Sequence, residues 1–250
     1  MSRRRFYAPS EAFNSHAQTV RLAADEARHL REVLRLKPGD EVYVFNGEGK
    51  EFQCTIDSSR RDAAILNLIT EVPAARPESP LQLTLAVALL KSDKFDLVVQ
   101  KATELGVVRV VPVLTKLADI KLKDESDAHK RVLRWRRIAL EAAKQSGRAL
   151  IPEIVELVSF PELIQSQASG VNVLFAERDG QSLESLAHNV VTDASLTALV
   201  GSEGGWTDSE IETAKKAGWK VITLGGRTLR AETAAIAVTT LLQHIFGDLN

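Results

Sequence analysis

The stretch LGGRTLRAETAA, Leu224–Ala235, holds the residue types that most clearly point to chemistry. A short apolar strand runs into two glycines, Arg227 and Arg230 follow three residues apart, and Glu232 opens a long apolar segment, 232–246. Positive side chains oppose the helix dipole at an amino terminus, so Glu232 or a bound anion should compensate. We predict that this turn holds a cofactor and that its arginines face a polyanion. The alternative is a pair of surface arginines beside a helix start.

A second glycine-rich loop lies in VGSEGGWTDSEI, residues 200–211. Glycine allows close backbone approach and positive φ, and Thr207 and Glu210 form a capping box that starts a helix. The glycines are Gly201, Gly204 and Gly205. The loop has neither the Lys-Ser/Thr of a phosphate-binding Walker loop nor the spacing of a dinucleotide fingerprint. It is either a cofactor cradle built from backbone groups or a plain strand-to-helix turn.

The segment KRVLRWRRIALEAAKQSGR, residues 130–148, holds seven Lys and Arg against one acidic residue. Its apolar positions mark one helical face and leave the basic side chains largely outward. A run of one sign without acidic partners predicts a phosphate-backbone footprint rather than a solvated face. The predicted RNA-binding residues are Arg131, Arg134, Arg137, Lys144 and Arg148, with Arg227 from the turn.

The composition sets the class of protein. The chain has 250 residues, a net charge of −1, and one cysteine, Cys54, which excludes an internal disulfide and fits a reducing cytoplasm. The five histidines show no metal-ligand spacing. The basic start leads into no apolar run, and the longest apolar run, residues 83–90, is far shorter than the roughly 20 residues that cross a bilayer. We therefore expect a cytoplasmic protein without membrane contact.

Three prolines in PAARPESP, residues 73–80, favour an extended spacer and indicate a domain boundary. Before it, residues 42–56 alternate around Asn46-Gly47 as in a β-hairpin, residues 63–72 alternate similarly, and 25–34 form a short helix. These elements predict a small β-barrel.

After the boundary, apolar strands alternate with helical stretches, which favours a parallel α/β sheet. Such sheets bind ligands where the carboxyl ends of their strands meet. The predicted strands are 83–89, 108–114, 171–177, 196–201 and 220–225.

Five stretches together resemble one family: HLREVLRLKPGD, KFDLVVQKATELGV, KQSGRALIPEI, VGSEGGW and LGGRTLRAETAA. They are similar to the ribosomal RNA small subunit methyltransferase E family, which methylates N3 of one uridine in 16S rRNA. The resemblance implies a PUA-like RNA-binding barrel at 1–72, a linker at 73–80, and a SPOUT-type, trefoil-knotted parallel-sheet methyltransferase domain at 81–250. It also implies S-adenosylmethionine as cofactor and an obligate homodimer that acts on 16S rRNA or the assembled small subunit.

Carried over position by position, the resemblance assigns cofactor binding to Leu199, Gly201, Gly204, Leu224, Gly225, Leu229, Arg230, Thr233 and Ala234. The chain departs from the family pattern in four places. Ser202 stands where proline is usual, Gly226 and Thr228 replace proline and an aliphatic residue, and residues 113–122 lack a Glu-Arg pair.

The implied reaction is an in-line displacement on a sulfonium methyl group, which depends mainly on alignment. Arg230 is the candidate for stabilising the uracil anion, and Glu203 or Glu232 for accepting the N3 proton. Two alternatives stay open. One is a methyltransferase of the same fold that acts on a ribose 2′-hydroxyl or on tRNA, and the other is an RNA-binding module without catalysis.

Overall fold

The computed structural model describes residues 3–120, 124–166, 170–187 and 195–249. It divides into two compact units: Met1–Glu78 with Leu140–Ile151, and Ser79–Ala139 with Pro152–Asn250. The unit boundary after Glu78 falls inside the proline-rich stretch 73–80. The contacts group residues 140–151 with the amino-terminal unit, whereas the sequence assigned them to the domain that follows. The predicted limits of the folding domains stay a prediction.

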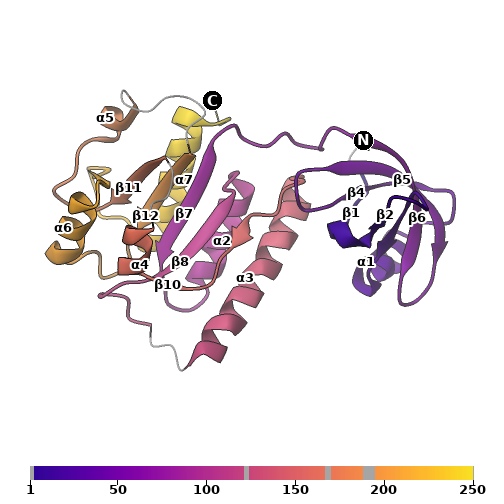
Figure 1. The fold of residues 1–250 in the computed structure, drawn as a ribbon, viewed down its shortest axis with the longest axis horizontal. Coiled ribbons are helices and arrows are strands. Elements are labelled where there is room, and N and C mark those ends of the chain that lie inside the picture. Colours follow the sequence, from indigo (N-terminus) through magenta and orange to yellow (C-terminus); the bar gives the residue numbers. More distant parts are fainter. Residues whose placement is uncertain (1–2, 121–123, 167–169, 188–194, 250) are drawn as a thin grey trace. The chain divides into compact units, whose positions relative to one another are not determined.

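The amino-terminal unit is built on a six-stranded sheet with the order β1-β4-β5-β6-β3-β2 (Figure 1). All neighbouring strands are antiparallel except β1 and β4. Register shifts in β5 bend the sheet, because a bulge adds local twist. The strands are β1 Arg5–Tyr7, β2 Phe13–Asn14, β3 Thr19–Leu22, β4 Glu41–Phe45, β5 Glu51–Ser59 and β6 Ala64–Val72. The helical segments are η1 Ser10–Ala12, α1 Ala24–Arg28 and the π-helical η2 His29–Val33, so the predicted short helix at 25–34 is confirmed.

The predicted hairpin at Asn46-Gly47 is confirmed as the antiparallel pair β4–β5, but its turn is longer than the dipeptide indicated. Residues 46–50 separate the strands, and Gly47 and Gly49 take left-handed φ values of 82° and 96°. The side-chain oxygen of Asn46 accepts hydrogen bonds from the backbone N–H groups of Glu48 and Lys50, at 2.9 and 3.1 Å. The asparagine therefore closes the turn with its side chain and keeps a negative φ.

The carboxyl-terminal unit contains a seven-stranded, wholly parallel sheet. Its order is β10-β8-β7-β12-β11-β13, with β9 also paired to β8. All five predicted strands are present: β7 Gln82–Ala88, β8 Arg109–Leu114, β11 Val171–Phe175, β12 Ser195–Val200 and β13 Lys220–Ile222. Two short strands are added, β9 Glu153–Ile154 and β10 Val158–Ser159. Because β12, β11 and β13 are neighbours, their carboxyl ends meet at one edge of the sheet.

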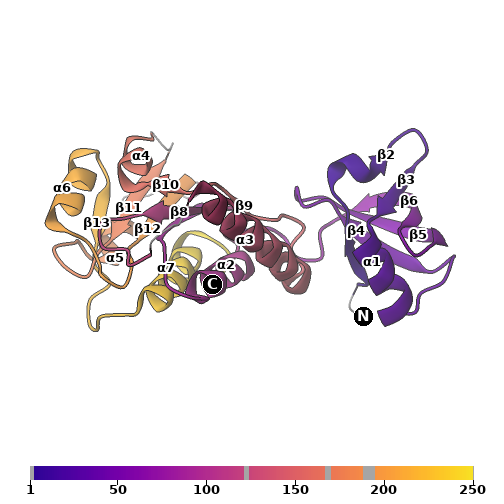
Figure 2. The same cartoon turned by 90° about the horizontal axis from the view of Figure 1, so that it is seen from below.

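Helices cover both faces of this sheet, with α4 and α6 on one side and α2 and α7 on the other (Figure 2). The helices of the unit are α2 Lys94–Glu104, α3 Glu125–Ser146 (whose residues from Leu140 on group with the other unit), α4 Phe160–Gln165, α5 Leu183–Ala187, α6 Asp208–Lys216 and α7 Ala231–Phe246. The predicted closing helix is thus confirmed. It buries one face, including Ala235, Val238 and Leu242, and packs on β12, β7 and α2.

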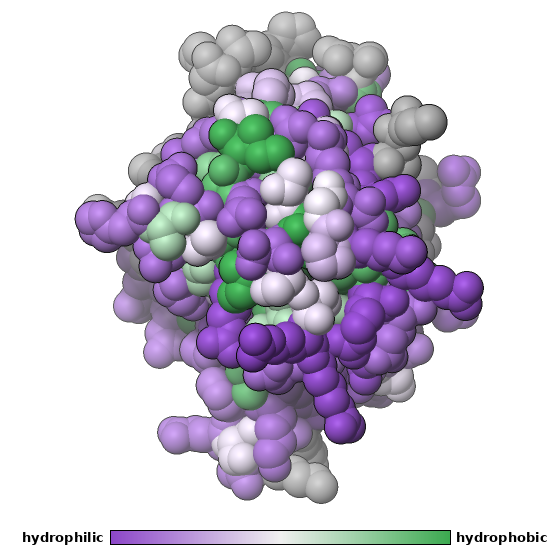
Figure 3. All heavy atoms as spheres, turned by 90° about the vertical axis from the view of Figure 1, so that its right-hand side faces the viewer, coloured by the Kyte–Doolittle hydropathy of each residue, from purple (hydrophilic) through white to green (hydrophobic). Residues whose placement is uncertain are grey.

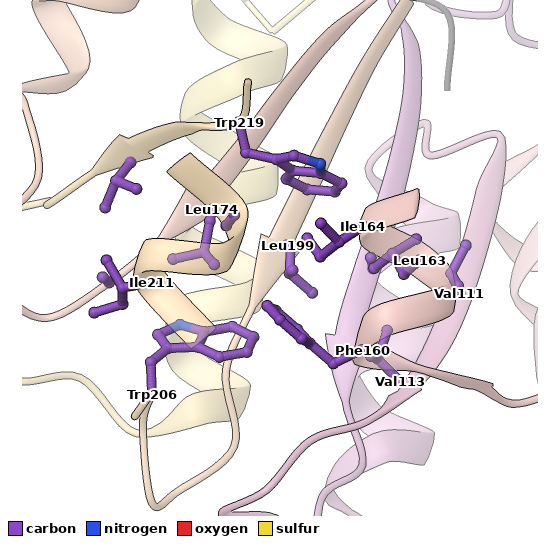
Figure 4. Packing of buried hydrophobic residues seen from close by; sticks show 14 residues of the cluster. Val111, Val113, Phe160, Leu163, Ile164, Leu174, Leu199, Trp206, Ile211 and Trp219 are labelled. Atoms are coloured by element: carbon purple, nitrogen blue, oxygen red, sulfur yellow. The ribbon is translucent and has the colours of Figure 1, made fainter. Parts of the chain in front are cut away.

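One row of side chains crosses the sheet beneath α4 and α6. The strand register aligns the row Val111, Ala86, Leu199, Leu174 and Val221, and all five residues are buried in one cluster. Figure 4 shows the aromatic rings of Phe160 and Trp206 that cover this row, with centroids 5.6 Å apart. This packed layer of side chains ends at the carboxyl ends of the strands, where the loops described below begin.

On the face shown in Figure 3, hydrophilic residues predominate and hydrophobic residues form only small patches. Among the described helices, none has the length and apolar character needed to cross a bilayer. Cys54 is buried in the core of the amino-terminal unit, as a small hydrophobic residue would be, and burial raises the pKa of its thiol to about 12.

Candidate functional site

A cavity of about 580 Å³ opens at the shared edge of β11, β12 and β13. Its walls come from the ends of these strands, the two predicted glycine-rich loops and the start of α7. This is the place where a parallel sheet presents ligand sites. The lining residues are Phe175, Ala176, Glu177, Val200, Gly201, Ser202, Glu203, Gly204, Gly205, Trp206, Thr223, Leu224, Gly225, Gly226, Arg227, Thr228, Leu229, Arg230, Ala231, Ala234 and Val238.

The first loop, residues 201–206, is a tight turn held from two sides. The N–H of Gly205, which has a φ of +68°, donates to the carbonyl of Ser202 at 2.9 Å. The indole N–H of Trp206 donates to the carbonyl of Phe175 at 2.9 Å, which ties the loop to the end of β11. The predicted capping box of Thr207 and Glu210 is present and starts α6.

Gly204 is needed for a reason other than positive φ, since its φ is not in the left-handed region. A Cβ there would lie 2.8 Å from both the Cβ and the carbonyl oxygen of Leu117. The hydroxyl of Ser202 donates to the same carbonyl at 3.0 Å. Two departures from the family pattern, Ser202 and the 113–122 segment, therefore meet at Leu117. Within the described part of that segment, residues 113–120, Leu117 supports the first loop.

The second loop, residues 223–230, is held at its start and open in its middle. The hydroxyl of Thr223 accepts a hydrogen bond from the N–H of Gly180 at 3.1 Å. Gly225 and Gly226 follow with φ values of +70° and +77°, and a Cβ on either would meet nothing within 4 Å. These two glycines are therefore required by backbone conformation, and they leave free space on the cavity side.

Seven of the nine predicted cofactor residues line this cavity: Gly201, Gly204, Leu224, Gly225, Leu229, Arg230 and Ala234. Leu199 does not, because its side chain points into the core row beneath α4 and α6. Thr233 is exposed on α7 and does not line the cavity either. The sequence reasoning missed the end of β11, where Phe175, Ala176 and Glu177 line the cavity. Their signal was the predicted strand 171–177, but the sequence did not show that it lies beside β12 and β13.

The two predicted proton acceptors share one lysine that the sequence reasoning also missed. Lys94, the first residue of α2, donates to Glu203 at 2.9 Å and lies 3.6 Å from a carboxylate oxygen of Glu232. Glu203 lines the cavity with a side chain that is 31% exposed, whereas the Glu232 side chain is 14% exposed and is not part of the lining. The structure therefore gives Glu203, and not Glu232, direct access to the cavity.

The Lys94–Glu203 hydrogen bond sets the protonation of both groups. It is the main cause that raises the pKa of Lys94, with further contributions from the charges of Glu203 and Glu232. Burial alone would raise the pKa of Glu203, but the hydrogen bond and charge of Lys94, together with hydrogen bonds from the backbone of Glu203 and Lys91, outweigh it, so that pKa is lowered. Both groups are charged at neutral pH.

Arg227 and Arg230 lie in the exposed second loop and line the cavity. Neither forms a salt bridge with any residue that the structure describes. Arg230 is the residue immediately before α7, where the helix dipole disfavours a cation. Two guanidinium groups that line a cavity and have no salt bridge to the described residues are suited to attract an anion.

The basic helix differs from its prediction, because several of its arginines pair with acidic residues that lie outside residues 130–148. Arg131 pairs with Asp127 at 3.4 Å, Arg134 pairs with Asp96, and Arg136 pairs with Glu156 at 3.1 Å. Arg137 is exposed and has no salt bridge with the described residues. Of the predicted RNA-binding residues on this helix, Arg137 alone presents an unpaired charge to solvent in the described structure.

Arg148 and Lys144 do not belong to an exposed footprint. Arg148 is buried, with a guanidinium nitrogen 2.7 Å from Glu78, and its carbonyl accepts a hydrogen bond from Arg5. Lys144 pairs with Glu26 at 2.6 Å. The prediction that Arg148 contacts RNA is wrong, because a buried, paired guanidinium cannot reach a phosphate. Both residues fix the 140–151 segment within the amino-terminal unit.

A cavity between two glycine-rich loops at the edge of a parallel sheet, together with a small curled β-sheet unit, defines a SPOUT-type RNA methyltransferase with a PUA-like unit. Comparison with known families agrees: residues 77–243 match the RNA methyltransferase domain model, and residues 22–69 match the RNA methyltransferase PUA domain model. The chain belongs to the RNA methyltransferase family that includes the ribosomal RNA small subunit methyltransferase E proteins. The predicted fold class is thereby confirmed.

The similarity to individual proteins extends over most of the chain. The ribosomal RNA small subunit methyltransferase E of Bacillus subtilis is 29% identical over 91% of this chain and 91% of its own length. That of Rickettsia conorii is 31% identical over 87% of this chain and 86% of its own length. A crystal structure of the Neisseria gonorrhoeae ribosomal RNA small subunit methyltransferase E bound to S-adenosyl methionine superposes with a TM-score of 0.87, at 31% identity and full coverage of both chains.

The residues present fit such a cofactor. The cavity volume of about 580 Å³ lies within the range of small-molecule sites, roughly 300–1,000 Å³. Gly225 and Gly226 line the cavity, and no described atom lies within 4 Å of the position that a Cβ on either would take. Apolar side chains such as Leu224 and Val238 offer a wall for an adenine ring, and loop backbone groups offer hydrogen bonds.

Proposed function

We propose that this protein is an S-adenosylmethionine-dependent methyltransferase that methylates N3 of a specific uridine in small-subunit (16S) ribosomal RNA. The observation that carries the proposal is the cavity between two glycine-rich loops with two unpaired arginines at its mouth. Membership of the RNA methyltransferase family and the similarity to ribosomal RNA small subunit methyltransferase E proteins support it.

The two loops would hold the cofactor mainly through their backbone. Gly201 and Gly204 would provide one wall, and Leu224, Gly225, Leu229, Arg230 and Ala234 the other. Leu199 and Thr233 would contribute only indirectly, by supporting the residues that line the cavity, since neither lines it. When bound, S-adenosylmethionine supplies a sulfonium methyl group, which transfers to N3 as the carbon–sulfur bond breaks and its electron pair stays on sulfur.

The chain's own residues would prepare the nucleophile. Uracil N3 carries a proton and attacks poorly until that proton leaves, so an acceptor and a cation near the uracil oxygens are required. Glu203 is the better placed acceptor, because it lines the cavity and is held as a carboxylate by Lys94. Arg230 lines the same cavity without a salt bridge to the described residues and would stabilise the anion that forms at O2 or O4.

The RNA would arrive at the arginine side of the cavity. Arg227 at the cavity mouth and Arg137 on α3 are the described candidates with free charge, and Arg131 and Arg134 would have to exchange their acidic partners for phosphates. The proposed substrate is 16S rRNA, either free or in the assembled small subunit. We place the reaction in the cytoplasm, where ribosomal RNA is available and where Cys54 stays reduced.

A second copy of the chain is the proposed partner. α7 packs on α2, and this pair leaves two leucines exposed, Leu97 at 39% and Leu241 at 36%; Leu249, beyond the end of α7, is 42% exposed. Exposed apolar side chains that gather on one surface favour a subunit interface. Sedimentation equilibrium tests this directly: a mass near twice 27.4 kDa supports the dimer, and a monomer at micromolar concentration contradicts it.

Nucleoside mass spectrometry of RNA from strains with and without the gene tests the reaction. We expect N3-methyluridine to disappear from small-subunit rRNA in the deletion strain and to return with the wild-type gene. Loss of a 2′-O-methylated nucleoside or of a tRNA modification would instead assign another RNA position. Unchanged RNA, with no calorimetric binding of S-adenosylmethionine, would favour an RNA-binding module without catalysis.

A further inference from the structure

Lys94 connects the two loops that form the cavity, although it belongs to neither. Its ammonium group lies 2.9 Å from a carboxylate oxygen of Glu203, in the first loop. It also lies 3.6 Å from a carboxylate oxygen of Glu232, at the start of α7 directly after the second loop. Among the residues that the structure describes, Lys94 is the only side chain with salt bridges to both sides of the cavity.

The bridge is anchored in a rigid part of the fold. Lys94 is the first residue of α2, which follows β7 and packs along α7. The next residue, Phe95, is buried with its ring 4.2 Å from that of Trp135. The lysine backbone is therefore fixed by core packing, while the loops that it bridges consist largely of glycine and exposed residues.

Electrostatics make this contact more than a surface ion pair. The Glu232 side chain is 14% exposed, and its oxygen nearest to Lys94 is buried without a hydrogen-bond partner. Removal of the ammonium group would take away the salt-bridge partner that Glu232 has among the described residues, and the positive charge of Arg230, which lowers the pKa of Lys94, would remain in the region. A buried charge without its partner is costly, so the two loops would move apart or take up protons.

We propose that Lys94 is a positioning residue: it couples the first glycine loop, through Glu203, to the start of α7, through Glu232, and so sets the width of the S-adenosylmethionine cavity. The inference rests on the proposed function, because it assigns a role at the same site. It differs from a catalytic role in that Lys94 does not line the cavity and acts through the two carboxylates.

The test compares Lys94→Met with Lys101→Met in the full-length protein. Lys101 lies on the same helix, has similar exposure and pairs at 2.8 Å with Glu104, and among the described residues it forms no salt bridge with either loop. Both variants lose one lysine, but Lys94→Met breaks two salt bridges and Lys101→Met breaks one, so Lys94→Met should melt at the lower temperature, and cofactor affinity is compared at a temperature where both variants are folded. Calorimetry with S-adenosylmethionine should show affinity at least about fivefold weaker for Lys94→Met and unchanged for Lys101→Met, as expected when coupling between two sites is lost. Lys94→Arg should restore much of the affinity.

Two further readouts separate coupling from general damage. Double-mutant cycles on cofactor affinity should show non-additive effects of Lys94→Met with both Glu203→Gln and Glu232→Gln. The pH profile of cofactor affinity should also move. Lys94 lowers the pKa of Glu203, so the wild-type contact persists until the pH falls below the ordinary carboxyl range. In Lys94→Met the hydrogen bond and charge of Lys94 are lost, so the pKa of Glu203 should rise relative to the wild type, and affinity should fall at a higher pH.

The outcomes are distinct. Equal affinity in Lys94→Met and Lys101→Met overturns the proposal, as does additivity with Glu232→Gln, since the bridge to the second loop would then be absent. A wild-type protein that binds no S-adenosylmethionine would refute the proposed function itself. A wild-type protein that binds it, with an affinity loss confined to Lys94→Met and non-additive with both carboxylates, supports the coupling.

Discussion

Gly225 and Gly218 form a matched pair that tests whether the second loop holds the cofactor. Both adopt left-handed backbone, with φ of +70° and +84°, and a Cβ on either would meet nothing within 4 Å. Both lie in the carboxyl-terminal unit, but Gly225 lines the cavity, whereas Gly218 follows α6 away from it. Alanine at each position therefore imposes the same conformational strain, and only one alanine changes the cavity.

The expected loss of stability follows from the backbone alone. A residue with a Cβ in left-handed conformation costs about 1–2 kcal/mol, and no steric clash adds to it at either site. For a chain of this size, each kcal/mol lowers the melting temperature by about 2–4 °C. Tryptophan fluorescence is a suitable probe, because Trp135, Trp206 and Trp219 all lie in the carboxyl-terminal unit. Both alanine variants should melt a few degrees below the wild type.

Cofactor affinity should then separate the two variants. In Gly225→Ala the new methyl group lies where the ligand would approach the backbone, so calorimetry should show S-adenosylmethionine bound at least about tenfold more weakly, a loss of about 1.4 kcal/mol. Gly218→Ala should bind it as the wild type does. Equal affinities in the two variants, at equal loss of stability, would refute the idea that the second loop cradles the cofactor.

Three further predictions concern charge and burial. Arg137→Gln should weaken RNA binding and lower the slope of log K against log salt by about 0.7–0.9, which filter binding over a salt series measures. Arg148→Gln should instead lower the stability of the protein, because it breaks a buried ion pair, and thermal melts check this. Glu51→Gln should lower the free energy of unfolding by about 3–5 kcal/mol, since this fully buried carboxylate pairs with two arginines. Glu71→Gln, at an exposed pair, should lower it by only about 0–1 kcal/mol, and chemical denaturation measures both. The raised pKa of Cys54 should keep its thiol protonated and unreactive to iodoacetamide at pH 8 in the folded protein; rapid labelling without denaturant would contradict this.

The strands of the parallel sheet were predictable because each is mainly apolar and alternates with helical stretches along the chain. The order of the strands was not, since nothing in residues 171–177 or 196–201 says that the later strand inserts between the earlier one and β7. That order decides the site: it brings the end of β11 to the cavity, with Glu177 and the carbonyl that binds Trp206. Local sequence patterns predicted the two loops, but the end of β11, which also lines the cavity, is placed there by strand pairing between distant parts of the chain.

For the loop glycines, too, the place in the cavity was predictable from the sequence, but the physical reason was not. The sequence indicated that Gly204 and Gly225 serve one cradle, and both line it. Their physical reasons differ, because Gly204 makes room for Leu117 and Gly225 takes a left-handed φ. The contact with Leu117 joins residues that are distant in sequence, so no reading of the loop alone could find it.

The sequence of residues 130–148 alone did not show which of their basic side chains have acidic partners in the folded protein. Most acidic partners of residues 130–148 lie outside that segment: Asp96, Asp127, Glu156, Glu78 and Glu26, with Glu141 as a partner inside it. An arginine already paired with a carboxylate must give up that contact to bind a phosphate, so its net contribution to RNA affinity is small. The unpaired guanidinium groups of Arg227 and Arg230 have no such cost. The attraction for RNA should therefore be strongest at the cavity mouth, where a phosphate held by Arg227 would bring the neighbouring base toward Glu203 and Arg230. Electrostatic attraction and alignment for reaction would then come from the same short loop.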